Sequence, residues 1–315
     1  MAIRVCERRL GVDVGKEWLD IADGQGVQRI ANTAVAIDGF LRQAGAPLRL
    51  AVEPTQRYHR RLLQAALAGG HTVYLVDPYR LSRYREAVGR RAKTDALDAR
   101  LLYRYLLAEG PRLRAYEMPP RAVQRLRELL HARAKLTVAK GTLAQSLAAI
   151  GALAPTREAL VAGLQSAIAQ VDRQLEDSLQ EAGYAADAQR CQSIPGVGPL
   201  SGAALVASYH RGHFRSADAF VAYLGLDLRV RESGRYRGQR KLSKRGDPEV
   251  RRLLFNAARA GARTGPWRGY YQRLRERGLS TTAACVALSR KLARLAYTLL
   301  RDQSEYRRTV AAQLD

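Results

Sequence analysis

Five short apolar runs rich in β-branched residues lie in the first 115 or so residues, and they restrict the fold more than any other feature. The runs span residues 4–14, 18–23, 27–32, 48–53 and 72–77. Runs of this length are typical of strands, and only the later ones are separated by helical patterns. Short turns with Gly15 and Gly24 separate the first three runs, which predicts an antiparallel meander followed by parallel units.

The predicted order of three strands, then helix, strand, helix and strand, defines an α/β amino-terminal domain. This order is that of a ribonuclease H-like or RuvC-like domain, and equally that of one half of an actin-like ATPase. An actin-like ATPase would repeat its phosphate loop in a second half. The carboxy-terminal half of this sequence shows no such repeat.

A helical middle region follows, from Arg121 to about Gly183. Its apolar residues recur every three or four positions, at Leu160, Leu164, Ile168, Val171, Leu175 and Leu179. A single apolar seam of this length predicts a helical hairpin or coiled-coil arm, which would act as a spacer or an oligomerisation element. An ordinary bundle helix is the alternative.

The last region is predicted to be mainly α-helical and to begin with an element like a helix-hairpin-helix module. In the segment IPGVGPLSGAAL, Gly196 and Gly198 open onto a helix of small residues, where backbone N–H groups would face a DNA phosphate. A tight turn between two packed helices is the alternative. Residues 229–252 are arginine-rich and nearly lack aliphatic side chains, which predicts a ribbon or loop ahead of helices at 248–308.

The net charge of +24 at pH 7 indicates the kind of partner. Lys and Arg number 53 against 29 Asp and Glu, and all but seven of these cations are arginine. Such an excess destabilises a compact protein unless a polyanion neutralises it, and the planar guanidinium fork suits phosphate groups. Nucleic acid is the expected partner.

Cysteine spacing and hydropathy exclude several other classes. Cys6, Cys191 and Cys285 lie far apart without metal-binding spacing, so neither a disulfide framework nor a zinc finger is expected. Arginines interrupt the first apolar run, and prolines break the longest uncharged stretch, residues 191–210. We therefore expect that the protein does not associate with a membrane. We expect it to be cytoplasmic and associated with the nucleoid.

Four carboxylates on three predicted elements form the first candidate site. Asp13 lies within the strand of GVDVGK, where a buried charge is unfavourable unless a cation or several donors compensate it. Glu53 ends the strand of LAVEP, and Asp95 and Asp98 share one face of the helix that begins in KTDALDA. Together they would hold two Mg²⁺ ions, or Mn²⁺, which stabilise the entering and leaving oxygens of a phosphoryl transfer.

Each acid alone has a simpler interpretation. Asp13 also fits a phosphate-binding loop, Asp95 a helix cap and Glu53 an ordinary strand end. Asp20 and Asp77 lie near strand ends too, but they lack the basic and small neighbours of the other acids. The combination of the four acids, in this order and on these elements, favours the metal site.

A serine among cations forms the second candidate site. Ser243 lies in the motif RKLSKRGDP, just ahead of Asp247 and Pro248, which are typical of a helix N-cap and a first helical residue. Its flanking cations are Arg240, Lys241, Lys244 and Arg245. A hydroxyl in such a site would attack a phosphodiester and form a phosphoserine link. A serine that only contacts a DNA phosphate is the alternative.

These motifs together resemble the DEDD-type insertion-sequence transposases of the IS-one-ten family, also called bridge-RNA-guided recombinases. The resemblance covers essentially the whole chain through GVDVGK, AVEPT, KTDALDA, IPGVGPLSGAAL, FVAYLGL, SGRYRGQRKLSKRGD and VRRLLFNAA. It implies a RuvC-like catalytic domain at 1–118, a helical oligomerisation arm at 119–190 and a transposase domain with the serine at 191–315.

The resemblance also implies roles for single residues. Mg²⁺ would be held by four acids: Asp13, Glu53, Asp95 and Asp98. Ser243 would form a covalent phosphoserine with DNA, and the acids of one protomer would meet the serine of another within a homodimer or tetramer. A non-coding guide RNA would pair with the double-stranded donor and target DNA. The residues expected to contact nucleic acid are Lys93, Gly196, Gly198, Arg235, Arg237, Arg240, Lys241, Lys244 and Arg245.

One position departs from the pattern of that family. Where many relatives have Asn, this chain has Asp247. Aspartate caps a helix as well as asparagine does, so we expect full function despite a negative charge near the phosphate.

Two rival functions remain at the level of sequence. A RuvC-like nuclease would hydrolyse DNA with metal-bound water and would not need Ser243. A nucleic-acid-binding scaffold would need none of the acids. All four acids and the serine are present, which favours a recombinase.

Overall fold

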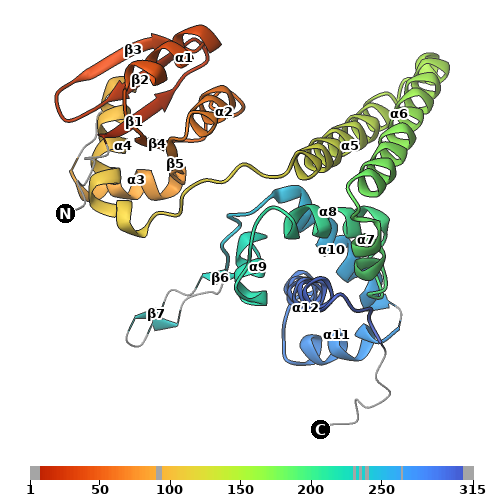
Figure 1. The fold of residues 1–315 in the computed structure, drawn as a ribbon. Helices are drawn as coiled ribbons and strands as arrows, with labels where there is room; N and C mark the ends of the chain where they lie inside the picture. The colour runs from red at the N-terminus through yellow and green to blue at the C-terminus, as the bar shows by residue number, and fades with distance from the viewer. Residues whose placement is uncertain are drawn as a thin grey trace. The chain divides into compact units, whose positions relative to one another are not determined.

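The structure is a computed structural model that describes residues 8–89, 94–229, 232–233, 236–237, 241–263 and 265–307. The chain divides into two compact units, residues 1–118 and 119–315 (Figure 1). The first unit is α/β and the second is mainly helical, as the sequence predicts. No helix in these ranges is long and apolar enough to cross a lipid bilayer.

A five-stranded mixed sheet forms the centre of the first unit. Its strands are β1 (Arg8–Val14), β2 (Trp18–Ala22), β3 (Val27–Ala31), β4 (Leu48–Val52) and β5 (Thr72–Leu75). The spatial order is β3-β2-β1-β4-β5. β2 pairs antiparallel with β1 and β3, and β4 pairs parallel with β1 and β5. The predicted meander and parallel units are confirmed, while residues 4–7 of the first run lie outside the described part.

Two pairs of helices cover the two faces of this sheet. They are α1 (Ala34–Gln43), α2 (Arg60–Ala68), α3 (Pro78–Ala87) and α4 (Asp95–Glu109), and the short helix η1 (Gly110–Arg112) follows α4. Leu50 and Val52 of β4 are buried with residues of α1 and α2, whereas Ala51 is buried with residues of α3 and α4. Strand alternation therefore gives this unit two apolar cores, one on each face.

Gly11 of β1 lets α4 lie directly on the sheet. A Cβ atom at this position would stand 2.2 Å from both the carbonyl oxygen of Ala99 and the amide nitrogen of Tyr103. Both are backbone atoms of α4, so neither can turn aside as a side-chain tip can. Any residue larger than glycine would push α4, with its two acids, away from β1.

We expect Gly11→Ala to lower the free energy of unfolding by about 3 kcal/mol, because the added methyl overpacks a backbone contact. Urea titration of residues 1–315 would measure the change. Gly39→Ala is a matched control, because no atom lies within 4 Å of its virtual Cβ in α1. There alanine should stabilise the helix by about 0.5–1 kcal/mol. Equal effects of the two substitutions would contradict the close approach of α4.

The second unit begins with a hairpin of two long helices (Figure 1). These are α5 (Arg121–Ser146) and α6 (Ala154–Glu181), joined through the short helix η2 (Gly151–Leu153). Arg133 of α5 pairs with Asp172 of α6 across the hairpin. The predicted seam is buried at one end only, at Leu175 and Leu179, while Leu160 is 43% exposed. A hairpin of two helices leaves much of the seam partly exposed, and the seam is buried only where the hairpin packs against the helical core of the second unit.

In the described part of the second unit, six further helices and a small ribbon follow the hairpin. The helices are α7 (Ala185–Gln192), α8 (Pro199–Tyr209), α9 (Ala217–Tyr223), α10 (Pro248–Arg263), α11 (Trp267–Glu276) and α12 (Thr281–Asp302). In the ribbon, β6 (Leu228–Arg229) pairs with β9 (Lys241–Leu242), and β7 (Glu232–Ser233) pairs with β8 (Tyr236–Arg237). The ribbon predicted within residues 229–252 is therefore confirmed in its described parts.

Candidate active site

Strand register brings the first two acids side by side. Gly11 of β1 lies opposite Ala51 of β4 in the parallel ladder. Side chains alternate along a strand, so Asp13 lies on the face of Gly11 and Glu53 on the face of Ala51. These are one and the same face of the sheet, the face that α4 covers. On the other side of β1, Asp13 lies opposite Asp20 of β2, on that same face.

The helix α4 carries the other two acids in its first turn. Thr94 is its N-cap, and the Thr94 hydroxyl accepts a hydrogen bond from the Leu97 amide at 3.4 Å. Asp95 and Asp98 are therefore not needed as caps. Asp98 is only 5% exposed, an unusual position for a carboxylate, whereas Asp95 is exposed.

The acids influence one another electrostatically. Burial raises the pKa of Asp13 to about 6, and the charges of Asp98, Asp95, Glu53 and Asp20 add to this rise in that order. A carboxyl group whose pKa is raised by nearby carboxylates lies among like charges that are not fully compensated. The structure thus brings together all four acids that the sequence singles out, with Asp20 as a fifth.

Two arginines pair with this cluster. Arg85 of α3 donates a hydrogen bond to Asp98 at 2.7 Å. Arg29 of β3 pairs with Asp20 at 2.9 Å and lies 3.6 Å from Asp95. As the side chains stand, no group of three or more His, Cys, Asp or Glu residues in the described ranges has the geometry of a metal site. The arginines draw Asp98 and Asp95 toward themselves.

The donor set nevertheless fits a hard divalent cation. All its members are carboxylates, which are the ligands that Mg²⁺ and Mn²⁺ prefer. Burial and, after it, the charges of the neighbouring carboxylates raise the pKa of Asp13, and a bound cation would offset both effects. Of the two rival acids, Asp77 is the N-cap of α3 and accepts a hydrogen bond from the Arg80 amide at 3.0 Å. Asp20 belongs to the cluster.

Two glycines shape the loop that carries Ser243. A Cβ on Gly225 would lie 2.4 Å from the amide nitrogen of Gly246, and one on Gly246 would lie 2.3 Å from the carbonyl carbon of Leu224. The segment after α9 and the segment before α10 therefore touch backbone to backbone. Within this contact, Lys244 has a positive φ of 55°, and its amide donates to the carbonyl oxygen of Gly225 at 3.2 Å.

Ser243 lies half-buried in this loop, with both of its polar groups bonded. Its amide donates to the backbone oxygen of Asp227 at 2.9 Å. Its hydroxyl donates a short hydrogen bond to the Asp227 carboxylate and accepts one from the Arg245 amide at 3.4 Å. The hydroxyl is thus held in one orientation, between a carboxylate and a backbone N–H.

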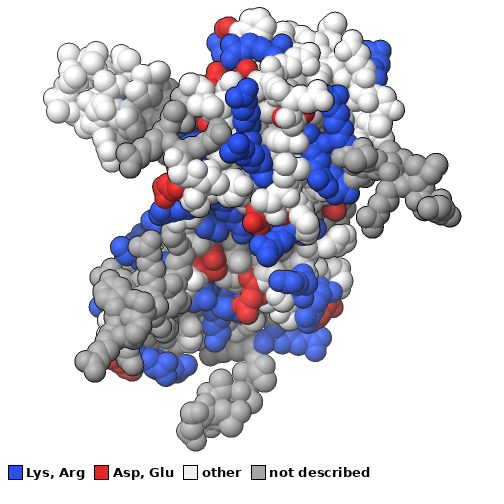
Figure 2. All heavy atoms as spheres, turned by 90° about the vertical axis from the view of Figure 1, so that its left-hand side faces the viewer, with Lys and Arg blue, Asp and Glu red and all other residues white. Residues whose placement is uncertain are grey.

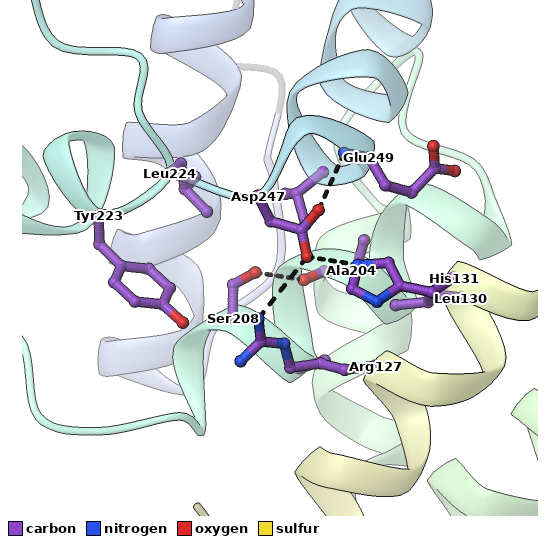
Figure 3. Close-up of a pocket in the computed structure, with 11 residues that line it drawn as sticks. Arg127, Leu130, His131, Ala204, Ser208, Tyr223, Leu224, Asp247 and Glu249 are labelled. Carbon is purple, nitrogen blue, oxygen red and sulfur yellow. Dashed lines mark hydrogen bonds and ion pairs between the residues drawn. The ribbon is translucent and has the colours of Figure 1, made fainter. Parts of the chain in front are cut away.

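Asp247 caps α10, and its carboxylate lines a small pocket together with His131 and Arg127 of α5 (Figure 3). One carboxylate oxygen accepts from the Glu249 amide at 2.9 Å, and the other lies 2.8 Å from His131 Nε2 and 3.7 Å from Arg127. Burial alone would raise the pKa of Asp247, but the hydrogen bond and charge of His131 hold it below its usual value. The negative charge is therefore balanced by α5.

The same hydrogen bond raises the pKa of His131. Only the folded state stabilises protonated His131, so the pair with Asp247 contributes to the free energy of unfolding. This contribution is fully present below the pKa of histidine in the unfolded chain, about 6.5. It is lost as the pH rises through the higher pKa of His131 in the folded protein. We expect His131→Gln to lower the unfolding free energy by about 0.5–1 kcal/mol near pH 6 and by little near pH 8.5. Thermal melting at both pH values measures this, and an equal loss at pH 6 and pH 8.5 would contradict a stabilising His131–Asp247 pair.

Comparison with known proteins identifies the family of this chain. Residues 10–153 match a DEDD transposase model of the IS110 type, and residues 188–272 match the model described as "Transposase IS116/IS110/IS902 family". The chain belongs to the IS110 family of transposases. The first match spans all four acids of the cluster, and the second spans Ser243. An IS110-family transposase is an enzyme of DNA recombination.

Curated relatives of this IS110-family transposase include near full-length ones. A "Probable family 20 transposase" of Pseudomonas aeruginosa is 28% identical over 95% of this chain and 98% of its own length. A "Pilin gene-inverting protein" of Moraxella lacunata is 27% identical over 82% of each chain. The transposase for insertion sequence element IS1111A of Coxiella burnetii is 38% identical over 38% of this chain and 35% of its own.

The residues expected to contact nucleic acid in this transposase lie in different settings. Lys241, Lys244 and Arg245 are exposed around Ser243. Gly198 is an exposed residue at the start of α8, whereas a Cβ on Gly196 would stand 2.6 Å from the Ala257 carbonyl of α10. The close packing of this turn against α10 therefore accounts for a glycine at position 196. Lys93, Arg235 and Arg240 lie outside the described residues, as does the side chain of Arg237.

Lysine and arginine side chains are spread widely over the surface. On the face seen in Figure 2 they form broad areas, while the acidic side chains appear as smaller separate patches. A surface of this kind neutralises phosphate charges without reading a base sequence.

Sequence reasoning missed several residues next to the two sites. Arg29 and Arg85 reach the acids from β3 and α3, and Asp227 reaches the serine from the loop after α9. Each is one member of a common residue type in an unremarkable stretch. Only long-range contacts distinguish them.

Proposed function

We propose that this chain is the transposase of an insertion sequence and that it cleaves and exchanges DNA strands with Ser243 as the nucleophile. The observation that carries the proposal is the cluster of Asp13, Glu53, Asp95 and Asp98 on the α4 face of the sheet. Carboxylates are rarely gathered against their mutual repulsion unless a function requires them. The order β3-β2-β1-β4-β5 supports a ribonuclease H-like fold for this unit.

A divalent cation such as Mg²⁺, held by the four acids, would stabilise the charge that develops on the entering and leaving oxygens of the scissile phosphate. Arg29 and Arg85 would hold Asp95 and Asp98 in place while the cluster is empty. At the second site, Lys241, Lys244 and Arg245 would bind the phosphodiester beside the Ser243 hydroxyl. The start of α10 would add further positive potential there.

The finer parts of the proposal are a guide RNA and a composite site. We propose that a non-coding RNA pairs with the donor and target DNA, and that the acids of one protomer act with Ser243 of another in a dimer or tetramer. The excess of arginine supports contact with the backbones of both nucleic acids. Mixing Asp13→Asn protein with Ser243→Ala protein should then restore strand exchange, because one mixed site keeps both functions. Full inactivity of the mixture would contradict a composite site.

The test of the function is a search for protein attached to DNA. Wild-type protein, its flank-encoded RNA, Mg²⁺ and labelled donor and target DNA are mixed, denatured with detergent, and digested with trypsin and nuclease. We expect mass spectrometry to find the peptide with Ser243 carrying phosphate. Cleaved DNA without attached protein would identify a hydrolytic nuclease instead. Binding without any cleavage would identify a scaffold.

A further inference from the structure

We propose that Asp227 is the proton acceptor for Ser243, and that it holds the hydroxyl ready for attack on the phosphodiester. This inference rests on the proposed function, because it needs Ser243 to be the nucleophile. The carrying observation is the short hydrogen bond from the Ser243 hydroxyl to the Asp227 carboxylate. A serine hydroxyl is a weak nucleophile unless an adjacent base takes its proton.

The carboxylate of Asp227 is not needed to fix the loop. The Ser243 amide already donates to the backbone oxygen of Asp227 at 2.9 Å, and the Lys244 amide donates to Gly225 at 3.2 Å. The close approach of Gly225 and Gly246 adds a further backbone constraint. Since the backbone alone sets the register of the two segments, the side chain of Asp227 is available to the hydroxyl.

The orientation of the hydroxyl suits proton transfer. The Arg245 amide donates to Ser243 Oγ, so the hydroxyl hydrogen lies toward Asp227 and the oxygen keeps a lone pair for attack. None of the described histidines is hydrogen-bonded to Ser243; those with side-chain bonds contact other residues. Within the described ranges, Asp227 is the side-chain acceptor of the serine proton.

In the proposed attack of Ser243 on the phosphodiester, each bond that forms is matched by one that breaks. The Ser243 Oγ–H bond breaks and its proton passes to the Asp227 carboxylate, while an Oγ–P bond forms. The P–O bond to one deoxyribose breaks, and the leaving oxygen takes up a proton from water and becomes a hydroxyl. Asp227 then returns its proton to solvent.

Several of the charged groups near Asp227 and Ser243 are cations. Arg290 of α12 is close enough for Asp227 to act on its pKa, which burial lowers. Its Nε is buried and has no hydrogen-bond partner among the described residues. Lys244 and Arg245 follow Ser243 directly, and Lys241 lies on β9. The cations that flank Ser243 are placed to attract a phosphodiester toward its hydroxyl.

The test is Asp227→Asn, which keeps the size and the acceptor oxygen but cannot take a proton. We expect the rate of covalent adduct formation to fall about 10²–10³-fold near pH 7.5. Hydroxide would replace the missing base, so the variant's rate should rise about tenfold per pH unit toward pH 9, while the wild-type rate stays nearly flat. A loss of equal size at every pH would mean a structural role and would overturn the proposal.

Controls separate this inference from the proposed function. Asp302→Asn removes an exposed aspartate of the same unit, paired with Arg301, and should leave the rate unchanged. If Ser243→Ala still forms the adduct, the serine nucleophile itself is wrong. If Ser243→Ala forms none while Asp227→Asn equals wild type, only the role of Asp227 is wrong. If Asp227→Asn does not fold, Asp227→Glu provides the test, because glutamate keeps a carboxylate base. A steep rise of its rate of adduct formation with pH would contradict the proposal.

Discussion

Asp13→Asn should reduce DNA strand cleavage by about 10³-fold or more in the presence of Mg²⁺. Asp13 lies between Glu53 on β4 and the two acids of α4, and it feels the charge of all of them. Replacing it with an amide removes the negative charge with which Asp13 would hold the proposed cation, while keeping the shape of the side chain. Cleavage of labelled donor DNA under single-turnover conditions measures the loss.

The same substitution should stabilise the metal-free protein. The pKa of Asp13 rises from 3.8 to about 6 on folding, so the folded state binds more protons between these values. The unfolding free energy therefore falls as pH rises from about 4 to about 6, and ionised Asp13 opposes folding above that range. Because the side chain is partly exposed, we expect Asp13→Asn to add about 1–2 kcal/mol at pH 7 and to flatten this slope.

Opposite effects on activity and stability distinguish a functional site from a structural ion pair. Mg²⁺ should raise the melting temperature of the wild type, by binding the folded state, and should raise that of Asp13→Asn far less. Asp38→Asn is the matched control, because Asp38 lies on α1, which covers the other face of the sheet. If Asp13→Asn lowered the free energy of unfolding as well as the activity, the carboxylates would not be repelling one another in the folded protein.

The strands were predictable because a strand buried on both faces of the sheet has a continuous run of apolar residues. Leu50, Ala51 and Val52 are all buried, but in two different cores, so the run is continuously apolar. The helical seam was predicted only in part. Its period continues to Leu160, which is exposed, because sequence period alone does not say where further helices pack against the hairpin.

The acid cluster was predictable because strand alternation and helix position determine it. Asp13 lies near the end of β1 and Glu53 directly follows the neighbouring parallel strand β4, and Asp98 lies in the first turn of the helix that covers them. Its ion pairs were not predictable. Arg29 and Arg85 are two among many arginines, and their partners depend on how β3 and α3 are placed in three dimensions.

The setting of the serine needed the structure as well. Asp247 was expected beside a bound phosphate, yet it is held by His131, 116 positions earlier in the chain. Contacts of such long range leave no local pattern. The same applies to Gly196, where packing on α10 accounts for the glycine without a phosphate.

Ser243→Ala should abolish the covalent protein–DNA adduct completely and reduce strand exchange by about 10³-fold or more. The alanine variant keeps the loop backbone, whose bonds to Asp227 and Gly225 are made by main-chain atoms. It loses only the hydroxyl and its bonds to the Asp227 carboxylate and the Arg245 amide. Detergent-resistant attachment of labelled DNA to protein measures the effect.

Stability and DNA binding should change little, because removing one partly exposed hydroxyl with its hydrogen bonds costs about 1 kcal/mol. Ser304→Ala, at an exposed position of the same unit, is the matched control and should form the adduct normally. The decisive comparison is with Asp13→Asn. If Ser243→Ala still cuts DNA at the wild-type rate while Asp13→Asn does not, water bound at the acid cluster is the nucleophile and the enzyme is a hydrolytic nuclease. If both variants lose cleavage while binding DNA normally, the acids and the serine act on the same phosphate.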